Sequence, residues 1–147
     1  MTTSPVVGSH PPRFYRPTWA EVDLGLFRQN LERFRARMGR KIKICFVVKA
    51  NAYGHGAAPL ARAAQAAKVD WLGVSSVEEG IALREAGLAL PILVLGSLYP
   101  FESFLAAVRY GLTPTVASLD AAERLAEVAR TLEADAKVAC HVKLDTG

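Results

Sequence analysis

Hydrophobic and polar positions follow two different periods along this chain. Apolar residues recur at helical spacing over residues 24–38, which predicts an amphipathic helix. Its apolar face comprises Leu24, Phe27, Leu31 and Phe34. Helical patterns also occupy residues 57–68, 77–86, 101–110 and 119–132. Gly87 would end the helix at 77–86, and Ser118 would cap the helix at 119–132. Apolar runs of strand length predict strands at residues 42–48, 71–74, 91–95, 113–117 and 138–144.

The order of these elements predicts the fold class. Strands that alternate with helices imply right-handed crossovers and a parallel sheet, so we predict an α/β fold with about five strands. The run 42–48 is apolar apart from Lys43, which is typical of a strand covered on both faces. A length of 147 residues suits one domain with a real core.

Composition narrows the setting of the protein. A hydrophobic content of 51% with 22% charged residues is that of a globular protein, and no apolar run approaches the ~20 residues of a membrane span. Residues 1–17 are rich in Pro, Ser and Thr and predict a flexible tail rather than a signal peptide. Cys45 and Cys140 lie in strand-like runs, and we expect buried, reduced thiols of a cytoplasmic protein rather than a disulfide or a metal site.

The basic excess is mild, at 18 Lys and Arg against 14 Asp and Glu. Six of these cations cluster where the first helix ends: Arg33, Arg35, Arg37, Arg40, Lys41 and Lys43. Cations at a helix C-terminus complement its dipole, and no recognition motif or interleaved aromatic residues accompany them. We therefore predict a solvated face, and neither nucleic acid nor membrane as a partner.

One lysine stands at the end of the first strand. The segment 47–56 reads VVKANAYGHG, so Lys49 follows the apolar run and a glycine-rich turn leads into a helix. A lysine at a strand end, partly withdrawn from water, can present a neutral amine for Schiff-base chemistry. The turn from Tyr53 to Gly56 offers backbone N–H groups beside a helix N-terminus, which suits a phosphate. An amine beside a phosphate site predicts pyridoxal 5'-phosphate as the cofactor.

These ten residues resemble the cofactor-lysine signature of alanine racemase. The similarity extends in order from about Arg16 to the last residue, so the motif has its expected context. TWAEVDL at 18–24 resembles the opening strand of that family. The similarity also includes VEEG at 77–80, LREAG at 83–87, PILVLG at 91–96 and KLDTG at 143–147.

The resemblance implies roles for four residues. Lys49 would hold the cofactor and then act as one of two acid/base groups at the substrate Cα, and the hydroxyl of Tyr53 would reach the cofactor phosphate. Leu95 would pack against the pyridine ring, and Lys143 aligns with a lysine that is often carbamylated. For Asn51, His55 and the neighbouring glycines we expect a part in shaping the loop. His141 shares a strand face with Lys143 by period-two alternation and is expected beside the site.

The family fold is an eight-stranded (β/α) barrel of the TIM type followed by a β-rich domain. By this resemblance residues 18–147 form a partial barrel, the N-terminal half or slightly more, without the C-terminal β domain. The implied activity is interconversion of L-alanine and D-alanine for peptidoglycan synthesis, with a homodimer for the full-length protein. We expect the 147-residue chain alone to be inactive. A racemase of broader specificity and a non-catalytic remnant that binds the cofactor are the alternatives.

Overall fold

The computed structural model describes residues 20–39, 41–132 and 137–147. The predicted tail at 1–17 lies outside these residues. Five strands form one parallel sheet in the order β1-β2-β3-β4-β5, which confirms the predicted α/β class. The strands are β1 (Cys45–Val47), β2 (Trp71–Val74), β3 (Ile92–Val94), β4 (Thr113–Val116) and β5 (His141–Val142). The helices are α1 (Leu24–Met38), α2 (Lys49–Tyr53), α3 (Ala57–Ala66), α4 (Val77–Glu85), α5 (Phe101–Arg109) and α6 (Leu119–Thr131).

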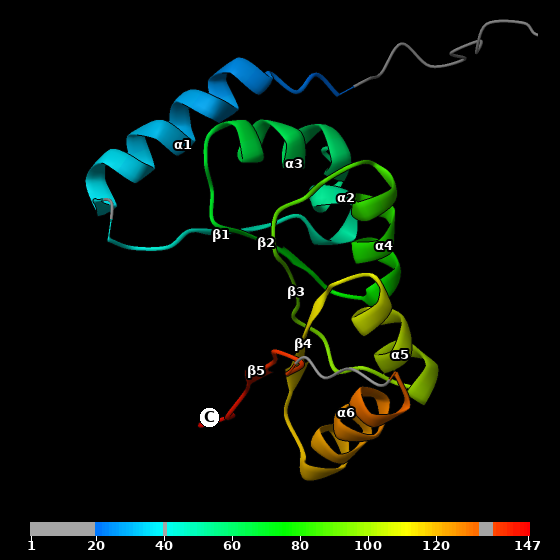
Figure 1. The fold of residues 1–147 in the computed structure, drawn as a ribbon. Coiled ribbons are helices and arrows are strands. Elements are labelled where there is room, and N and C mark those ends of the chain that lie inside the picture. The colour runs from blue at the N-terminus through cyan, green and yellow to red at the C-terminus, as the bar shows by residue number, and fades with distance from the viewer. Residues whose placement is uncertain (1–19, 40, 133–136) are drawn as a thin grey trace, which may run out of the picture.

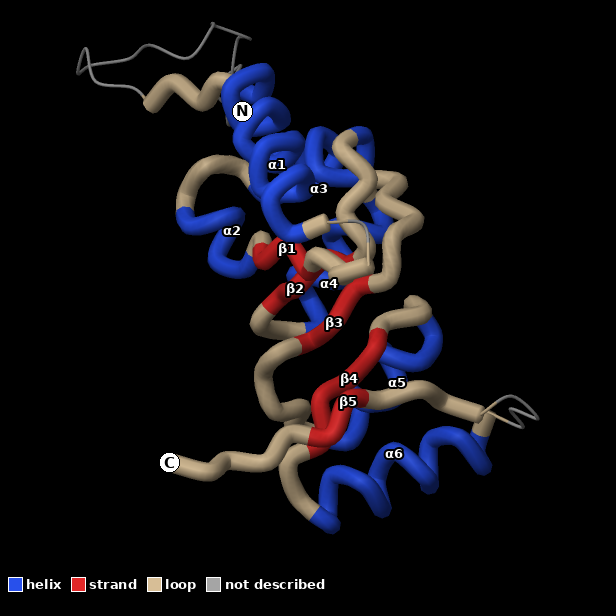
Figure 2. Tube along the Cα trace, turned by 90° about the vertical axis from the view of Figure 1, so that its left-hand side faces the viewer, coloured by secondary structure: helices blue, strands red, loops and turns tan. Residues whose placement is uncertain are grey.

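The helices α3 to α6 follow one another along one side of the sheet, and α1 crosses its upper end (Figure 1). The core fills the space between these helices and the sheet, where Leu72, Val74, Ile92 and Val94 are almost fully buried. Figure 2 shows the strands stepping down the molecule one after another. We call the edge at which all five strands end the carboxyl edge, and the opposite edge the amino edge.

The sheet is strongly curved. The rings of Trp71 in β2 and His141 in β5 lie 5.4 Å apart, although β3 and β4 separate these strands in the sheet. Such a contact requires the inner faces of β2 and β5 to turn toward each other. The curvature is that of a partial (β/α) barrel, as predicted.

The inner strands match their predicted ranges within a residue or so, whereas the two outer strands are much shorter. A strand lies within each of the predicted ranges 42–48 and 138–144, but the predicted extents are wrong, since β1 holds three residues and β5 two. Both have a neighbouring strand on one side only, among the residues that the structure describes. Ile42 is 46% exposed and Leu144 is 81% exposed, so the start of the first run and the end of the last are not covered. Both thiols are free but exposed, which corrects the prediction that Cys45 and Cys140 are buried.

Helix α1 begins at a side-chain cap. The carboxylate of Asp23 accepts hydrogen bonds from the N–H groups of Gly25 and Leu26, and residues 20–23 form no strand, contrary to the resemblance. Of the predicted apolar face, Phe27 and Leu31 pack against the core, and the Phe27 ring lies 5.0 Å from the Phe46 ring. Leu24 is 39% exposed and Phe34 is 51% exposed, so the two ends of this face remain at the surface.

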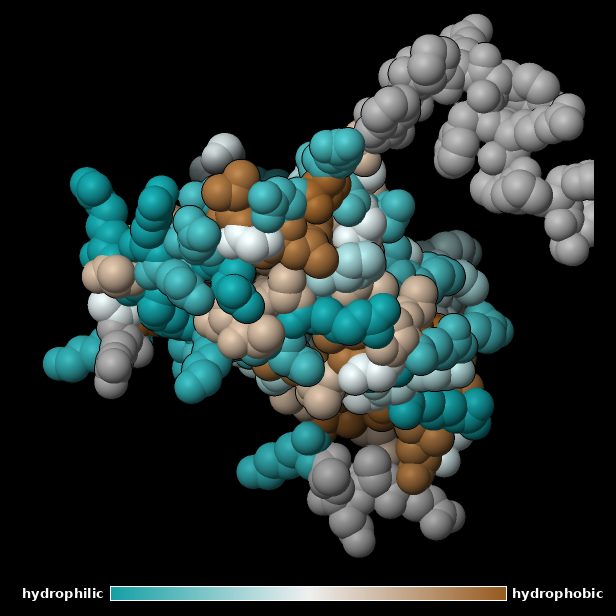
Figure 3. All heavy atoms as spheres, turned by 90° about the horizontal axis from the view of Figure 1, so that it is seen from above, coloured by the Kyte–Doolittle hydropathy of each residue, from teal (hydrophilic) through white to brown (hydrophobic). Residues whose placement is uncertain are grey.

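The end of α1 carries the basic cluster. Most of its members are exposed as predicted: Arg33, Arg37, Lys41 and Lys43. Figure 3 views this side and shows hydrophilic residues crowded at the left, where α1 ends. Arg40 lies outside the described residues. Arg35 departs from the prediction because it turns inward and is half-buried.

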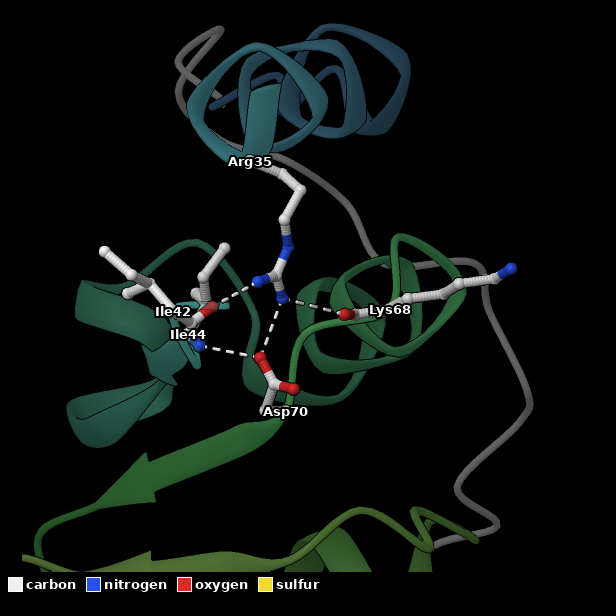
Figure 4. A network of polar contacts seen from close by, with 5 residues as sticks. All are labelled: Arg35, Ile42, Ile44, Lys68 and Asp70. Carbon is white, nitrogen blue, oxygen red and sulfur yellow. Dashed lines mark hydrogen bonds and ion pairs between the residues drawn. The ribbon is translucent and has the colours of Figure 1, made fainter. Parts of the chain in front are cut away.

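Arg35 ties α1 to the start of the sheet (Figure 4). Its guanidinium donates to the carbonyls of Ile42 and Lys68 and to Asp70 Oδ2, the last at 2.7 Å. The same carboxylate oxygen accepts from the Ile44 N–H at 2.7 Å. The Arg35 hydrogen bond, reinforced by that of Ile44, holds the pKa of Asp70 below its usual range.

Candidate active site at the carboxyl edge

Three of the four predicted site residues lie just beyond the ends of alternate strands. Lys49 is the second residue after β1, Leu95 follows β3 directly and Lys143 follows β5 directly. The N–H groups of Leu95 and Lys143 continue the ladder by donating to the carbonyls of Val74 and Val116, each at 2.8 Å. In a parallel sheet these ends meet at one edge, so the fold brings the three residues to the same side of the molecule.

Gly73 shows which residues share the inner face of the sheet. A Cβ at this position would lie 3.2 Å from Leu95 Cδ1 and from Val47 Cγ2, and 3.4 Å from Cys45 Sγ. The side chains of β1 and β3 therefore approach each other across the missing side chain of β2. Leu95 is half-buried and Lys143 is exposed. Together Val47 and Leu95 form an apolar wall below the carboxyl edge.

The turn after Lys49 has a left-handed backbone. The φ angles of Ala50, Asn51, Ala52 and Tyr53 lie between 50 and 53°. L-residues adopt this conformation at a disadvantage of roughly 1–2 kcal/mol each, and almost always singly. Four in a row therefore need compensating contacts, and they make this turn the most strained backbone described in the chain. The sequence predicts a turn here, but not its hand.

The contacts of this turn are mostly internal. The N–H groups of Gly54, His55 and Gly56 donate to the carbonyls of Ala50, Ala52 and Asn51 respectively. The N–H of Ala57, at the start of α3, donates to Asn51 Oδ1 at 2.8 Å. The prediction that backbone N–H groups of residues 53–56 bind a phosphate is therefore wrong, because the N–H groups of Gly54, His55 and Gly56 already donate to carbonyls within the turn.

Two side chains shape the loop as expected, and one is presented to solvent. Asn51 caps the start of α3, and His55 Nδ1 lies 2.9 Å from the Ala52 carbonyl oxygen. Tyr53 ends the left-handed turn and is 62% exposed, while Lys49 at its start is half-buried. An amine and a phenol are thus displayed at the two ends of one short turn.

Glu79 in the first turn of α4 is a site residue that the sequence analysis missed. Its Oε1 accepts from the Ala50 N–H at 2.6 Å, and its Oε2 accepts from the N–H and hydroxyl of Ser75, each at 2.8 Å. Burial alone would raise the pKa of Glu79, but the hydrogen bonds from Ser75 and Ala50 outweigh it and hold the pKa low. The spacing from Ser76 to Glu79 is that of a capping box, the signal that could have drawn attention to it.

His141 contacts the Trp71 ring on the inner face, which fits its predicted alternation with Lys143. No three His, Cys, Asp or Glu side chains gather into a possible metal site within the described ranges. In that same part of the chain, no helix has the length and apolar character needed to cross a membrane.

The residues at the carboxyl edge fit an aromatic cofactor that carries an aldehyde. The Lys49 amine suits the aldehyde, the Tyr53 hydroxyl can donate to an anion, and the side chains of Val47 and Leu95 over Gly73 offer a flat ring an apolar wall. The curved parallel sheet and the strand-end lysine define a (β/α)-barrel enzyme domain with its site at the carboxyl edge.

Comparison with known proteins identifies the family within this class. The sequence pattern of the family "Alanine racemase, N-terminal domain" matches residues 22–147, and the chain belongs to that family. It is 46% identical over 132 residues to an alanine racemase of Symbiobacterium thermophilum, and 41% identical over 133 residues to alanine racemase 1 of Oceanobacillus iheyensis. Each match covers 90% of this chain.

Solved structures agree with the sequence matches. The chain is similar to the alanine racemase of Clostridium difficile 630, with a TM-score of 0.78 and 41% identity over 92% of this chain. The match covers 35% of that structure, 34% of the Symbiobacterium relative and 35% of the Oceanobacillus relative. The chain thus spans about a third of the length of these relatives.

Proposed function

We propose that this protein is a pyridoxal-phosphate-dependent racemase that interconverts L-alanine and D-alanine. The observation that carries the proposal is the position of Lys49, at the carboxyl edge and at the start of a turn whose sequence is the family signature. Membership of the alanine racemase family supports the reaction. Lys49 attaches the cofactor and, once released, is one of the two acid/base groups at the substrate Cα.

The neighbouring residues divide the remaining tasks. The Tyr53 hydroxyl reaches the phosphate, Leu95 packs with Val47 against the ring, and Lys143 stands at the end of β5 on the same edge. The bound cofactor supplies the electron sink that makes removal of the Cα proton feasible. The chain supplies the amine that moves this proton and the apolar wall that keeps water from one side of the ring.

The setting of the reaction follows from the family. We propose that the substrate is a small-molecule amino acid and that the D-alanine formed is used for peptidoglycan synthesis. We further propose that the protein acts in the cytoplasm and that the full-length protein is a homodimer. Residues 18–147 serve as the barrel portion that carries the cofactor lysine. Racemisation assays with several amino acids on the full-length protein would separate alanine from a broader substrate range.

Trapping of the cofactor tests the role of Lys49. The purified chain is incubated with pyridoxal phosphate, reduced with borohydride, digested and mapped by mass spectrometry. We expect the label at Lys49, its loss in Lys49→Ala and its retention in Lys41→Ala, which removes an exposed lysine before β1. Label spread over the exposed lysines, and equal in total in Lys49→Ala, would contradict the proposal.

A further inference from the structure

The peptide that joins Lys49 to Ala50 is held by a residue far away in the sequence. Its N–H donates to Glu79 Oε1 at 2.6 Å, and Glu79 lies 29 positions further along the chain. Because a peptide unit is planar, fixing this N–H fixes the rotation about the Cα–C bond of Lys49. The contact therefore sets how the Lys49 side chain lies relative to the turn that follows.

The turn depends on this contact because its other hydrogen bonds are local. Those described for residues 50–56 come from Val48, from the turn itself and from the start of α3. A left-handed stretch of this length is disfavoured, and it persists only where its surroundings determine it. The carboxylate of Glu79 in α4 fixes the first peptide of this stretch by accepting from the Ala50 N–H.

Packing holds only the middle of the turn, where Ala52 is buried in the core, whereas Ala50 and Asn51 are exposed. A cavity of about 400 Å³ lies between the turn, α3 and α4, lined by Val48, Asn51, Ala57, Val74 and Glu79 among others. A backbone that borders an empty space gains few dispersion contacts on that side. The start of the turn therefore rests on polar contacts, and the carboxylate of Glu79 supplies one of them at the border of this cavity.

Glu79 is itself rigidly held. Its second oxygen accepts twice from Ser75, and its own N–H donates to the cap hydroxyl of Ser76 at 3.4 Å. The Ser75 carbonyl oxygen in turn lies so near Gly96 that a Cβ there would be 2.3 Å away. The segments after β1, β2 and β3 thus form one connected unit at the carboxyl edge.

We infer that Glu79 is a positioning residue for Lys49, fixing the Lys49–Ala50 peptide and thereby directing the amine toward the cofactor. The role toward the cofactor rests on the proposed function, whereas the hold on the turn is independent of it. A capping-box glutamate ordinarily serves its own helix. This one also orders the loop that carries the reactive amine.

Three variants of the full chain test this inference. Glu79→Ala removes both acceptors, Glu79→Gln keeps one oxygen for the Ala50 N–H, and Glu78→Ala removes the neighbouring exposed carboxylate from the same turn of α4. Two measurements are made on each: amide hydrogen exchange at residues 50–56 without cofactor, and the share of borohydride-trapped pyridoxal phosphate found at Lys49. Circular dichroism reports that the fold is retained.

We expect exchange at Ala50 to rise about tenfold in Glu79→Ala, as loss of one charge-assisted hydrogen bond implies, with a smaller rise in Glu79→Gln. The share of label at Lys49 should fall in the same order, and Glu78→Ala should match the wild type in both. Unchanged exchange in Glu79→Ala, or an equal rise in Glu78→Ala, would overturn the inference. If the wild-type label is not at Lys49 while exchange responds as expected, the proposed function fails and the hold of Glu79 on the turn stands.

Discussion

The two edges of the sheet are held mainly by opposite kinds of polar contact, although Asp70 at the amino edge also accepts from the Ile44 N–H. At the carboxyl edge, where helices begin, side-chain oxygens of Asn51, Glu79 and Ser118 accept hydrogen bonds from backbone N–H groups. At the amino edge, where helices end, Arg35 and Arg84 donate to backbone carbonyls. The first turn of a helix leaves backbone N–H groups without partners within the helix, and the last turn leaves carbonyls without them. In a parallel α/β fold the helices begin at the carboxyl edge and end at the amino edge, so the N–H groups gather at the first edge and the carbonyls at the second.

The difference separates function from stability. The acceptors at the carboxyl edge surround a strained turn beside Lys49, so their loss is expected to change the site first. The donors at the amino edge join regular elements to one another, so their loss is expected to lower the free energy of unfolding. The same division between the two faces is general among barrels of this class.

Removing Arg84 should have the largest effect on stability. Its guanidinium donates to four carbonyls in two loops, those of Leu88, Leu90, Tyr110 and Gly111, at 2.7 to 3.1 Å. Arg84→Met leaves these groups without their donor, and we expect a loss of about 2–4 kcal/mol in the free energy of unfolding. Urea unfolding measures it.

The matched control is Arg109→Met, which removes an exposed arginine from the end of the next helix, α5. It should change the free energy of unfolding by less than about 0.5 kcal/mol. Trapped cofactor in the Arg84→Met protein that remains folded should still be found at Lys49. A shift of the label away from Lys49 in this variant would break the proposed division between the two edges.

A methyl group at Gly96 should disturb both stability and the site. Its Cβ would lie 2.3 Å from the Ser75 carbonyl oxygen, which belongs to backbone and cannot move aside freely. We expect Gly96→Ala to lower the free energy of unfolding by about 1–3 kcal/mol. It should also raise amide exchange at Ala50, because Ser75 holds Glu79.

Gly80→Ala provides the comparison for this variant. A Cβ at Gly80 would meet Leu112 Cδ1 at 2.7 Å, but that atom ends a flexible side chain at the amino end of β4. Gly80→Ala should therefore lower the free energy of unfolding by less than Gly96→Ala does. It should also leave amide exchange at Ala50 unaltered. Equal exchange in both variants would show that the three segments at the carboxyl edge are not connected.

Periodicity alone predicts the helices α1 and α3 to α6 and the three inner strands, because the spacing of apolar residues reflects which face of each element is buried. The strand at 71–74 was predicted without error because it is apolar and lies between two other strands. The left-handed turn could not be predicted, because Ala50, Ala52 and Tyr53 disfavour it and a contact from Glu79, 29 positions away, helps to hold it.

The phosphate site was mispredicted for a related reason. A glycine-rich turn before a helix presents free N–H groups only if they form no hydrogen bonds within the turn. Here the N–H groups of Gly54, His55 and Gly56 all donate to carbonyls of the turn. Lys49 is predicted from its place after an apolar run, whereas Leu95 and Lys143 are predicted by resemblance. The parallel strand order explains why residues so far apart in the sequence reach one edge.

The smallest effect should appear as pH dependence at the amino edge. Arg35 and the Ile44 N–H lower the pKa of Asp70 in the folded protein, so its carboxylate stabilises the fold at any pH above its unfolded pKa of about 3.9. This contribution is lost as the pH falls through the lower pKa of the folded state. Wild type should therefore exceed Asp70→Asn in stability near neutral pH, and the difference should shrink below about pH 4.

Urea midpoints measured from neutral to acidic pH would follow this difference. Asp120→Asn is the control, because Asp120 pairs with Arg124 at 3.6 Å on the exposed surface of α6, where such pairs contribute little. A difference between wild type and Asp70→Asn that persists unchanged in acid would mean that the aspartate acts by packing rather than by charge. Labelling at Lys49 should be equal in wild type and Asp70→Asn at neutral pH, since this contact lies at the edge that serves stability alone.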